Sequence, residues 1–282
     1  MPTSPTLPSR LQALLEEKKL MPVGNLQPLS GGDIAAVYQL ETHQGTVVVK
    51  HDDTASLQGE AEGLRALKAA NTPLVIPDVL GQEGEWLIME ALKAHGRGNA
   101  AALGEGLRAL HAKHGEQHGW HWDNACGSTP QPNTPLADGR AFQRERRLLP
   151  LSAACYERGL LDRALRTRIE NIADTLETWL PDAPPSLVHG DLWSGNVLYT
   201  PDGPALIDPA VYYHFPEVDL AMLTLFGAPG EAFFEAYWDA SAPADWPRRE
   251  ALFQLYPLLN HLLLFGTGYR GAVERCVAKL SG

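Results

Sequence analysis

The chain has 282 residues, 44% of them apolar, so it is long enough for one large domain or two lobes around a substantial core. Its formal net charge of -11 argues against nucleic acid and anionic membranes as partners, because binding either one requires a basic surface that neutralises phosphates. Its three cysteines, Cys126, Cys155 and Cys276, are odd in number and widely spaced, which argues against a disulfide framework and a zinc site and favours a reducing compartment.

No segment of the sequence has the pattern of a membrane anchor. Residues 1–10 are rich in Pro, Ser and Thr and lack the apolar core of a signal peptide. The longest apolar stretch, residues 258–265, is interrupted by Asn260 and His261. We therefore expect a cytoplasmic protein with no membrane partner.

The first 91 residues read as a small β-rich lobe. A capping-box pattern at Ser9 predicts an opening helix, since apolar residues then follow at helical spacing. Short β-rich runs at residues 36–38 and 46–50, separated by a His-Gln-Gly turn, predict an antiparallel hairpin. A helical pattern over residues 57–67 and a strand at residues 86–89 complete this lobe.

Two features of this lobe suit the binding of nucleotide phosphates. Lys50 ends a run of valines, so its side chain starts from a rigid strand, and Glu60 on the following helix is its best partner, with Glu62 as an alternative on another face. Gly31 and Gly32 precede the first strand of the hairpin, and glycines let backbone N–H groups approach phosphate oxygens closely. A solvated lysine and a plain turn are the alternative readings.

From residue 92 onward the pattern becomes mainly helical. The spacing predicts an amphipathic helix over residues 103–110 and a long helix over residues 161–179, which ends before a proline. Three prolines predict an irregular loop over residues 127–139. We therefore place the boundary at residues 90–92, between an N-terminal nucleotide-binding lobe (1–91) and a helical catalytic and substrate lobe (92–282).

Two groups of conspicuous side chains lie in this second part. Trp120 and Trp122 could line a sugar site or serve as packing residues. Arg144, Arg146 and Arg147 predict a solvated helix face.

The segment from residue 187 to residue 208 carries the strongest chemical signal. His189-Gly190-Asp191 is followed by Asn196, and Asp208 comes after two short apolar strands joined by a Pro-Asp-Gly turn. This spacing is typical of phosphotransferases, in which one aspartate accepts the proton of the attacking hydroxyl while the asparagine and a second aspartate hold Mg²⁺ against the ATP phosphates. An exposed polar loop is the alternative, and four polar groups at this spacing on a predicted hairpin disfavour it.

These residues resemble the fructosamine (ketosamine) kinase family. The resemblance rests on H-G-D-L-W-S-G-N at residues 189–196, I-D-P-A-V-Y-Y at residues 207–213 and E-V-D-L-A-M at residues 217–222. Aminoglycoside and choline kinase relatives share the H-G-D and the asparagine but usually lack the tryptophan and the D-P-A-x-Y-Y run. The resemblance covers nearly the whole chain, with departures at residues 214–216, where the family commonly has Gly-His, and at residues 134–142, where tryptophans are usual.

The resemblance implies an α+β, protein-kinase-like fold of two lobes, with a small antiparallel β-rich N-terminal lobe and a larger, mainly helical C-terminal lobe. It implies ATP-dependent phosphorylation of the sugar 3-hydroxyl of ketosamines, formed by glycation of a small amine or a protein lysine, which promotes deglycation. The roles carried over to this chain are the base (Asp191), the magnesium ligands (Asn196 and Asp208), the phosphate clamp (Lys50 with Glu60), the adenine-binding segment (Glu90, Ala91 and Leu92) and a structural aspartate that holds the catalytic loop (Asp219).

Trp193 most separates this chain from the aminoglycoside kinases. It lies two positions after Asp191, so we expect its indole to border the substrate hydroxyl and cover the C–H surface of the sugar. The alternative is that it packs under the catalytic loop. Two other functions remain open: a small-molecule kinase of the aminoglycoside phosphotransferase or choline kinase type, with an acidic pocket for a polycation, and a nucleotide-binding pseudokinase, which the intact lysine, asparagine and aspartates disfavour.

Overall fold

The computed structural model describes residues 7–29, 35–239 and 241–281. Its N-terminal lobe is built on a five-stranded antiparallel sheet with the order β1-β2-β3-β5-β4. The strands and helices of this lobe are α1 (Ser9–Glu17), β1 (Gln27–Pro28), β2 (Ala36–Thr42), β3 (Gly45–His51), α2 (Thr54–Ala69), β4 (Val79–Glu83) and β5 (Trp86–Glu90).

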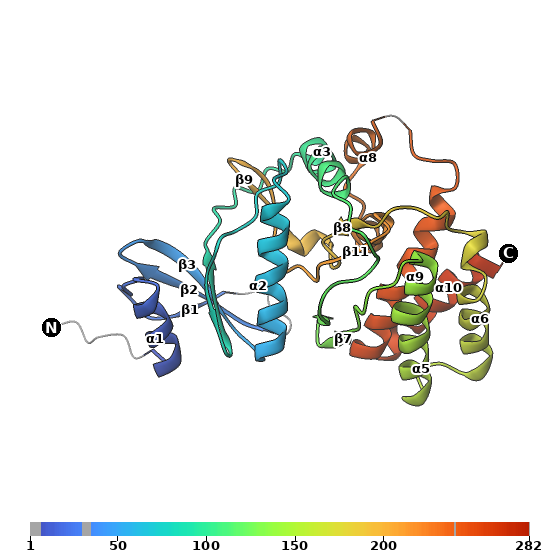
Figure 1. The fold of residues 1–282 in the computed structure, drawn as a ribbon, viewed down its shortest axis with the longest axis horizontal. Helices are drawn as coiled ribbons and strands as arrows, with labels where there is room; N and C mark the ends of the chain where they lie inside the picture. Colours follow the sequence, from blue (N-terminus) through green and yellow to red (C-terminus); the bar gives the residue numbers. More distant parts are fainter. Residues whose placement is uncertain (1–6, 30–34, 240, 282) are drawn as a thin grey trace.

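Helices α1 and α2 cover opposite faces of this sheet (Figure 1). The two-residue period of β3 explains the arrangement, because successive side chains of a strand point to opposite faces. Val47 and Val49 pack with α1, whereas Val48 packs in the core that contains α2. Lys50 therefore faces α2, the helix that carries Glu60.

In the part of the chain that the structure describes, the second lobe contains three two-stranded antiparallel sheets, β6-β7, β8-β11 and β9-β10, and most of the helices. Its elements are α3 (Ala100–His111), β6 (Asn124–Cys126), β7 (Thr129–Gln131), α4 (Gly139–Phe142), the π-helix η1 (Gln143–Leu148), α5 (Leu149–Glu157), α6 (Arg163–Ala173), η2 (Leu176–Thr178), β8 (Ser186–Val188), η3 (Ser194–Asn196), β9 (Val197–Thr200), β10 (Gly203–Leu206), β11 (Tyr212–His214), α7 (Glu217–Leu225), α8 (Glu231–Trp238), α9 (Trp246–Phe265), η4 (Thr267–Tyr269) and α10 (Arg270–Ser281).

Helices α5, α6, α9 and α10 surround the largest apolar core, at the end of the molecule away from the sheet (Figure 1). This arrangement confirms the predicted α+β class and the two-lobed fold. Among the described residues, no helix combines the length and apolar character that crossing a membrane requires.

Several predicted elements are confirmed and three details are wrong. The opening helix and the first hairpin form as predicted, although Pro8 rather than Ser9 occupies the N-cap of α1. The long helix predicted over residues 161–179 stops at Ala173, where the Thr175 hydroxyl donates a hydrogen bond to the Asn171 carbonyl at 3.0 Å. The loop predicted over residues 127–139 contains β7, which pairs with β6.

Arg147 corrects the prediction of a solvated arginine face. Its side chain is buried, with 1% of the residue exposed, and its guanidinium lies 4.2 Å from the ring centre of Tyr212 and 4.7 Å from that of Phe142. It donates a hydrogen bond to Asn133 Oδ1 at 2.6 Å. Cation–π contact and hydrogen bonds offset the cost of burying this charge. Arg144 does stay at the surface, where its Nε donates to Asp174.

Candidate active site

The catalytic loop, residues 189–196, follows β8. A glycine and a buried carboxylate from outside the loop hold its conformation. Gly190 has φ +83°, and a Cβ at this position would lie 2.1 Å from the Ala210 carbonyl oxygen, so only glycine fits. The buried carboxylate of Asp219 accepts hydrogen bonds from the backbone N–H groups of His189 at 2.7 Å and Gly190 at 2.9 Å. The loop-holding contact predicted for Asp219 is therefore confirmed.

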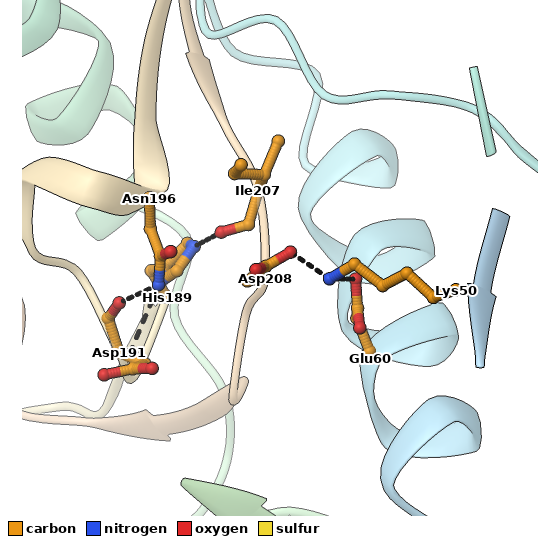
Figure 2. Close-up of polar contacts among 7 residues, drawn as sticks. All are labelled: Lys50, Glu60, His189, Asp191, Asn196, Ile207 and Asp208. Carbon is orange, nitrogen blue, oxygen red and sulfur yellow. Dashed lines mark hydrogen bonds and ion pairs between the residues drawn. The ribbon is translucent and has the colours of Figure 1, made fainter. Parts of the chain in front are cut away.

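His189 links this loop to the strand that leads to Asp208. Its Nε2 donates to the Ile207 carbonyl at 2.9 Å, and its Nδ1 accepts from the Asp191 N–H at 3.3 Å (Figure 2). One donating and one accepting nitrogen correspond to a neutral imidazole. Burial lowers the pKa of His189, which agrees with that protonation state. A neutral histidine thus acts as a spacer between the two aspartates.

The β9–β10 hairpin brings Asn196 next to the strand end that carries Asp208. Its register pairs Val197 with Leu206, and the Ile207 N–H donates to the Asn196 carbonyl at 3.1 Å. The Asn196 side-chain amide donates to the Asp191 carbonyl at 2.8 Å, which leaves its Oδ1 as a free acceptor (Figure 2). Asp208 has φ +55°, a left-handed conformation that aspartate tolerates better than most residues.

Lys50 bridges two carboxylates that come from different lobes. Its Nζ donates to Glu60 Oε1 at 2.8 Å and also contacts the Asp208 carboxylate (Figure 2). Burial by itself would lower the pKa of Lys50, but the charges of Glu60 and Asp208 outweigh it and raise the pKa. The lysine is therefore a fixed cation between α2 and the catalytic segment.

Two carboxyl groups of the site have pKa values raised to near neutral pH. Burial, followed by the charge of Asp208, raises the pKa of Asp191 to about 7. Burial also raises the pKa of Glu60 to about 7, against the opposing charge of Lys50. A carboxyl group whose pKa lies near the working pH is suited to proton transfer, so Asp191 has the properties of a general base.

One cavity of about 490 Å³ connects the lobes and is lined by most of the predicted site residues. Those that line it are Lys50, Glu60, Asp191, Trp193, Asn196 and Asp208. Glu90 ends β5 with its side chain exposed, and neither it nor Ala91 or Leu92 is among the lining residues. The predicted phosphate-binding glycines, Gly31 and Gly32, lie outside the described residues.

Trp193 lies on the catalytic loop and also borders the cavity. Its half-buried indole lines the cavity, and its ring also covers Gly195, where an added Cβ would lie 2.3 Å from it. The small residue at 195 thus lets the indole lie flat on the catalytic loop while one side borders the cavity.

Trp122 contacts α2, the helix that carries Glu60, and the sequence did not predict this contact. Its indole Nε1 donates to Glu62 Oε2 on α2 at 3.0 Å, and the adjacent strand β6 packs against the same helix. Because α2 carries Glu60, this contact helps to hold the partner of Lys50 in position. No local pattern connects residues 60 positions apart, so the sequence offered no signal for the pair.

A second unpredicted group lines the far end of the cavity. It includes Asn260 and His261 of α9 and the neighbouring aromatic residues Phe226, Phe265 and Tyr269. Asn260 and His261 did interrupt the longest apolar stretch of the sequence, and that interruption was the available signal.

A two-lobed fold with a lysine–glutamate pair, a catalytic-loop aspartate and a second aspartate across a cleft defines a protein-kinase-like phosphotransferase. Comparison with solved structures agrees: the fold aligns with a macrolide 2′-phosphotransferase of type I over 96% of both chains, with a TM-score of 0.63 at 16% identity. The family model for fructosamine kinase matches residues 9–281, so the chain belongs to the fructosamine kinase family.

Individual relatives agree with this family. The chain is 37% identical to a probable ketoamine kinase of Lactiplantibacillus plantarum, over 93% of this chain and 96% of the relative. It is 36% identical to a chloroplastic protein-ribulosamine 3-kinase of Arabidopsis thaliana, over 92% and 83%. A crystal structure from Thermobifida fusca, named as a fructosamine-3-kinase candidate, aligns over 98% of both chains with a TM-score of 0.88 and 30% identity. The predicted family and the assignment as an ATP-using phosphotransferase are confirmed.

Proposed function

We propose that this kinase transfers the γ-phosphoryl group of ATP to the 3-hydroxyl of a ketosamine. The observation that carries the proposal is the convergence of Lys50, Asp191, Asn196 and Asp208 on one cavity in a chain of this family. The relatives named as ketoamine and protein-ribulosamine kinases support the substrate class.

In this proposal Asp191 accepts the proton of the attacking hydroxyl. Its carboxylate lines the cavity, and its backbone is fixed through His189 and Asn196. The raised pKa of about 7 makes Asp191 a stronger base than an exposed carboxylate, and the group is still largely ionised slightly above neutral pH. A base held rigidly at the reacting oxygen contributes roughly 10²- to 10⁴-fold to the rate.

Asp208 and Asn196 provide oxygen donors that suit Mg²⁺. The Asp208 carboxylate and the free Oδ1 of Asn196 are hard ligands, and magnesium in kinases takes only one or two protein oxygens beside phosphates and water. When bound, the ion neutralises charge that develops on the phosphates. Lys50 supplies a second cation for the phosphates, and Glu60 orients it.

Three further assignments belong to the same proposal. The segment Glu90, Ala91 and Leu92 connects the lobes and binds the adenine, so residues 1–91 form the nucleotide-binding lobe and residues 92–282 the catalytic and substrate lobe. Gly31 and Gly32, which lie outside the described residues, keep their sequence-based assignment as phosphate-binding glycines. Trp193, whose indole borders the cavity, covers the sugar.

The far end of the cavity favours a ketosamine over an aminoglycoside. Among the described lining residues the carboxylates are Asp52, Glu60, Asp191 and Asp208, and none comes from the aromatic end formed by α7, α9 and η4. A polycation needs several carboxylates in its pocket, whereas a ketosamine carries one ammonium group.

The product explains why such an enzyme would be useful. A phosphate at C3 of a 1-amino-2-ketose becomes an allylic leaving group once the 1,2-enaminol forms. Its elimination leaves an imine at C1, and hydrolysis of that imine by water releases the amine and a 3-deoxy dicarbonyl sugar. Phosphorylation thus reverses glycation. The three buried free thiols suit a reducing compartment, and we propose the cytoplasm as the site of action.

A substrate panel with a coupled ADP readout tests the function. We expect magnesium-dependent ADP release with ribulosamines or fructosamines of simple amines, and phosphate at O3 in the product by ³¹P NMR. Asp191→Asn is the matched inactive control. Turnover of aminoglycosides or choline with none of the ketosamines would overturn the substrate class, and absence of turnover with every substrate would favour a pseudokinase.

A further inference from the structure

Four aromatic side chains form one continuous surface at the far end of the cavity. We call Phe226, His261, Phe265 and Tyr269 the aromatic wall. The His261 ring centre lies 4.9 Å from that of Phe226, 5.4 Å from that of Phe265 and 5.1 Å from that of Tyr269. Phe226 is 41% exposed and Phe265 is 55% exposed. Single exposed apolar residues are ordinary, but a connected group that lines a cavity points to a ligand.

The aromatic wall is continuous with the catalytic base. The same cavity is lined by Lys50 and Glu60 of the N-terminal lobe, by Asp191 of the catalytic loop and by the aromatic wall. Asp191 and His261 also line a smaller adjoining cavity, which places the two groups near each other. With ATP phosphates at the lysine, the phosphate acceptor has to lie on the side of Asp191 that faces the aromatic wall.

The chemistry of the wall suits an organic cation. His261 Nδ1 donates to the Pro257 carbonyl at 2.7 Å, so Nε2 of the neutral ring is an acceptor. Burial lowers the pKa of His261, which keeps the ring neutral at pH 7. The faces of Phe226, Phe265 and Tyr269 attract cations through their quadrupoles. An ammonium group thus finds π-faces and one nitrogen acceptor.

The wall offers no matching site for a carboxylate. Lys50 is the only lysine or arginine among the described residues that line the cavity, and Glu60 and Asp208 already engage it. Arg270 follows η4, but its guanidinium is paired with Asp162 at 2.5 Å and Glu274 at 2.9 Å. A carboxylate beside the substrate nitrogen would therefore lose hydration without gaining a partner.

We propose that the aromatic wall binds the ammonium group and the apolar substituent of the substrate amine. It thereby selects ketosamines of alkylamines or of a lysine side chain over those with a carboxylate beside the nitrogen. This inference rests on the proposed function. In a ketosamine the amine nitrogen is four bonds from the 3-hydroxyl oxygen, about 5 Å at most, so a sugar positioned at Asp191 brings its amine within reach of the wall.

The test compares two ribulosamines that differ by one charge, those of n-butylamine and of glycine. We expect the wild-type enzyme to have a kcat/KM at least about 10-fold higher for the butylamine derivative. Phe265→Ala and Phe226→Ala should each raise the KM for that substrate about 3- to 30-fold, with the KM for ATP unchanged. Phe265→Leu keeps the apolar contact but removes the π-face, so its KM for the butylamine derivative should lie between those of the wild type and Phe265→Ala. Phe265→Arg should narrow or reverse the preference.

Control experiments distinguish an effect on substrate binding at the aromatic wall from a loss of folding and from failure of the proposed function. Tyr156→Ala removes an aromatic ring on α5 that is 38% exposed, close to the exposure of Phe226, and does not line the cavity; it should leave both KM values unchanged. Melting temperatures of the Phe265 variants should stay near that of the wild type, because the ring is largely exposed. If ketosamines are turned over but both alanine variants keep the wild-type KM, or the glycine derivative is preferred, the inference is overturned and the proposed function stands. Absence of turnover with any ketosamine would overturn both.

Discussion

Replacing Asp191 by asparagine should stabilise the fold at alkaline pH while it lowers turnover. Burial, and then the charge of Asp208, raise the pKa of Asp191 from 3.8 to about 7. A carboxyl group with a raised pKa binds its proton more tightly in the folded chain than in the unfolded chain. The folded state therefore loses stability as the pH rises from about 4 to about 7, and this loss is complete above the folded pKa.

The magnitude follows from the size of the pKa shift. About 3 pKa units, at about 1.4 kcal/mol each, correspond to about 4 kcal/mol of unfolding free energy lost at pH 8. Asparagine carries no charge at any pH, so Asp191→Asn should raise the free energy of unfolding by about 2–4 kcal/mol at pH 8. At pH 4.5 the gain should be about 1 kcal/mol or less. Urea denaturation of both proteins at the two pH values measures the difference.

Asp202→Asn is the matched control, because Asp202 lies exposed in the turn of the β9–β10 hairpin. It should change the free energy of unfolding by about 0.5 kcal/mol or less at either pH. If Asp191→Asn changes the free energy of unfolding equally at the two pH values, or lowers it at pH 8, then ionisation of Asp191 does not destabilise the folded state and the reasoning is refuted.

The same group sets the pH dependence of turnover. Asp191→Asn should lower kcat by roughly 10²- to 10⁴-fold with ATP binding intact, because the amide cannot take the proton. In the wild type, kcat/KM for the ketosamine should fall about 10-fold per pH unit below about pH 7, where Asp191 becomes protonated. Near-normal turnover of the variant, or a flat profile between pH 5 and pH 7, would remove Asp191 from the role of base.

Asp208→Asn and Asn196→Ala should each weaken catalysis in a way that raised magnesium partly restores, and a loss that magnesium does not change would contradict their role as ligands. Trp193→Ala should raise the KM for the ketosamine with the KM for ATP and the melting temperature little changed, whereas a large fall in melting temperature with both substrates affected would place the indole in the core. Trp122→Phe keeps an aromatic ring but removes the indole N–H that donates to Glu62, and it should raise the KM for ATP about 2- to 5-fold. Glu62→Gln, which keeps an acceptor, should do less, and identical kinetics in both variants and the wild type would show that α2 does not depend on this contact.

Much of the catalytic segment was predictable because its signals are local. The Pro201-Asp202 turn between two apolar runs specifies a tight hairpin, and the observed register of β9 and β10 closes on those two residues. The run of three valines before Lys50 likewise predicts the strand from which the lysine side chain starts, and β3 contains it. Lys50 pairs with Glu60, the helix glutamate that the sequence favoured over Glu62.

Features that depend on distant neighbours were not predictable. Arg147 read as a surface residue, and its burial depends on Tyr212, which comes from another element 65 positions later and stacks against its guanidinium. The aromatic wall joins Phe226 with residues of α9 and η4, and its members share no sequence pattern. The helix predicted over residues 161–179 ends at Ala173, because the Thr175 hydroxyl bond to the Asn171 carbonyl competes with the helical hydrogen bonds.

The amino-acid sequence by itself determined the kinase fold and the family, and it singled out the residues that we propose as the base, the metal ligands and the phosphate-binding lysine. Motif spacing encodes these within a few residues, through turn preferences and strand and helix periods. The tertiary structure alone decided that the pKa of Asp191 is raised to about 7, that Trp122 bonds to Glu62 on α2, and that the aromatic wall lines the same cavity as Asp191. Burial, charge coupling and cavity shape arise from side chains far apart in the chain, so they exist only after packing has brought those side chains together.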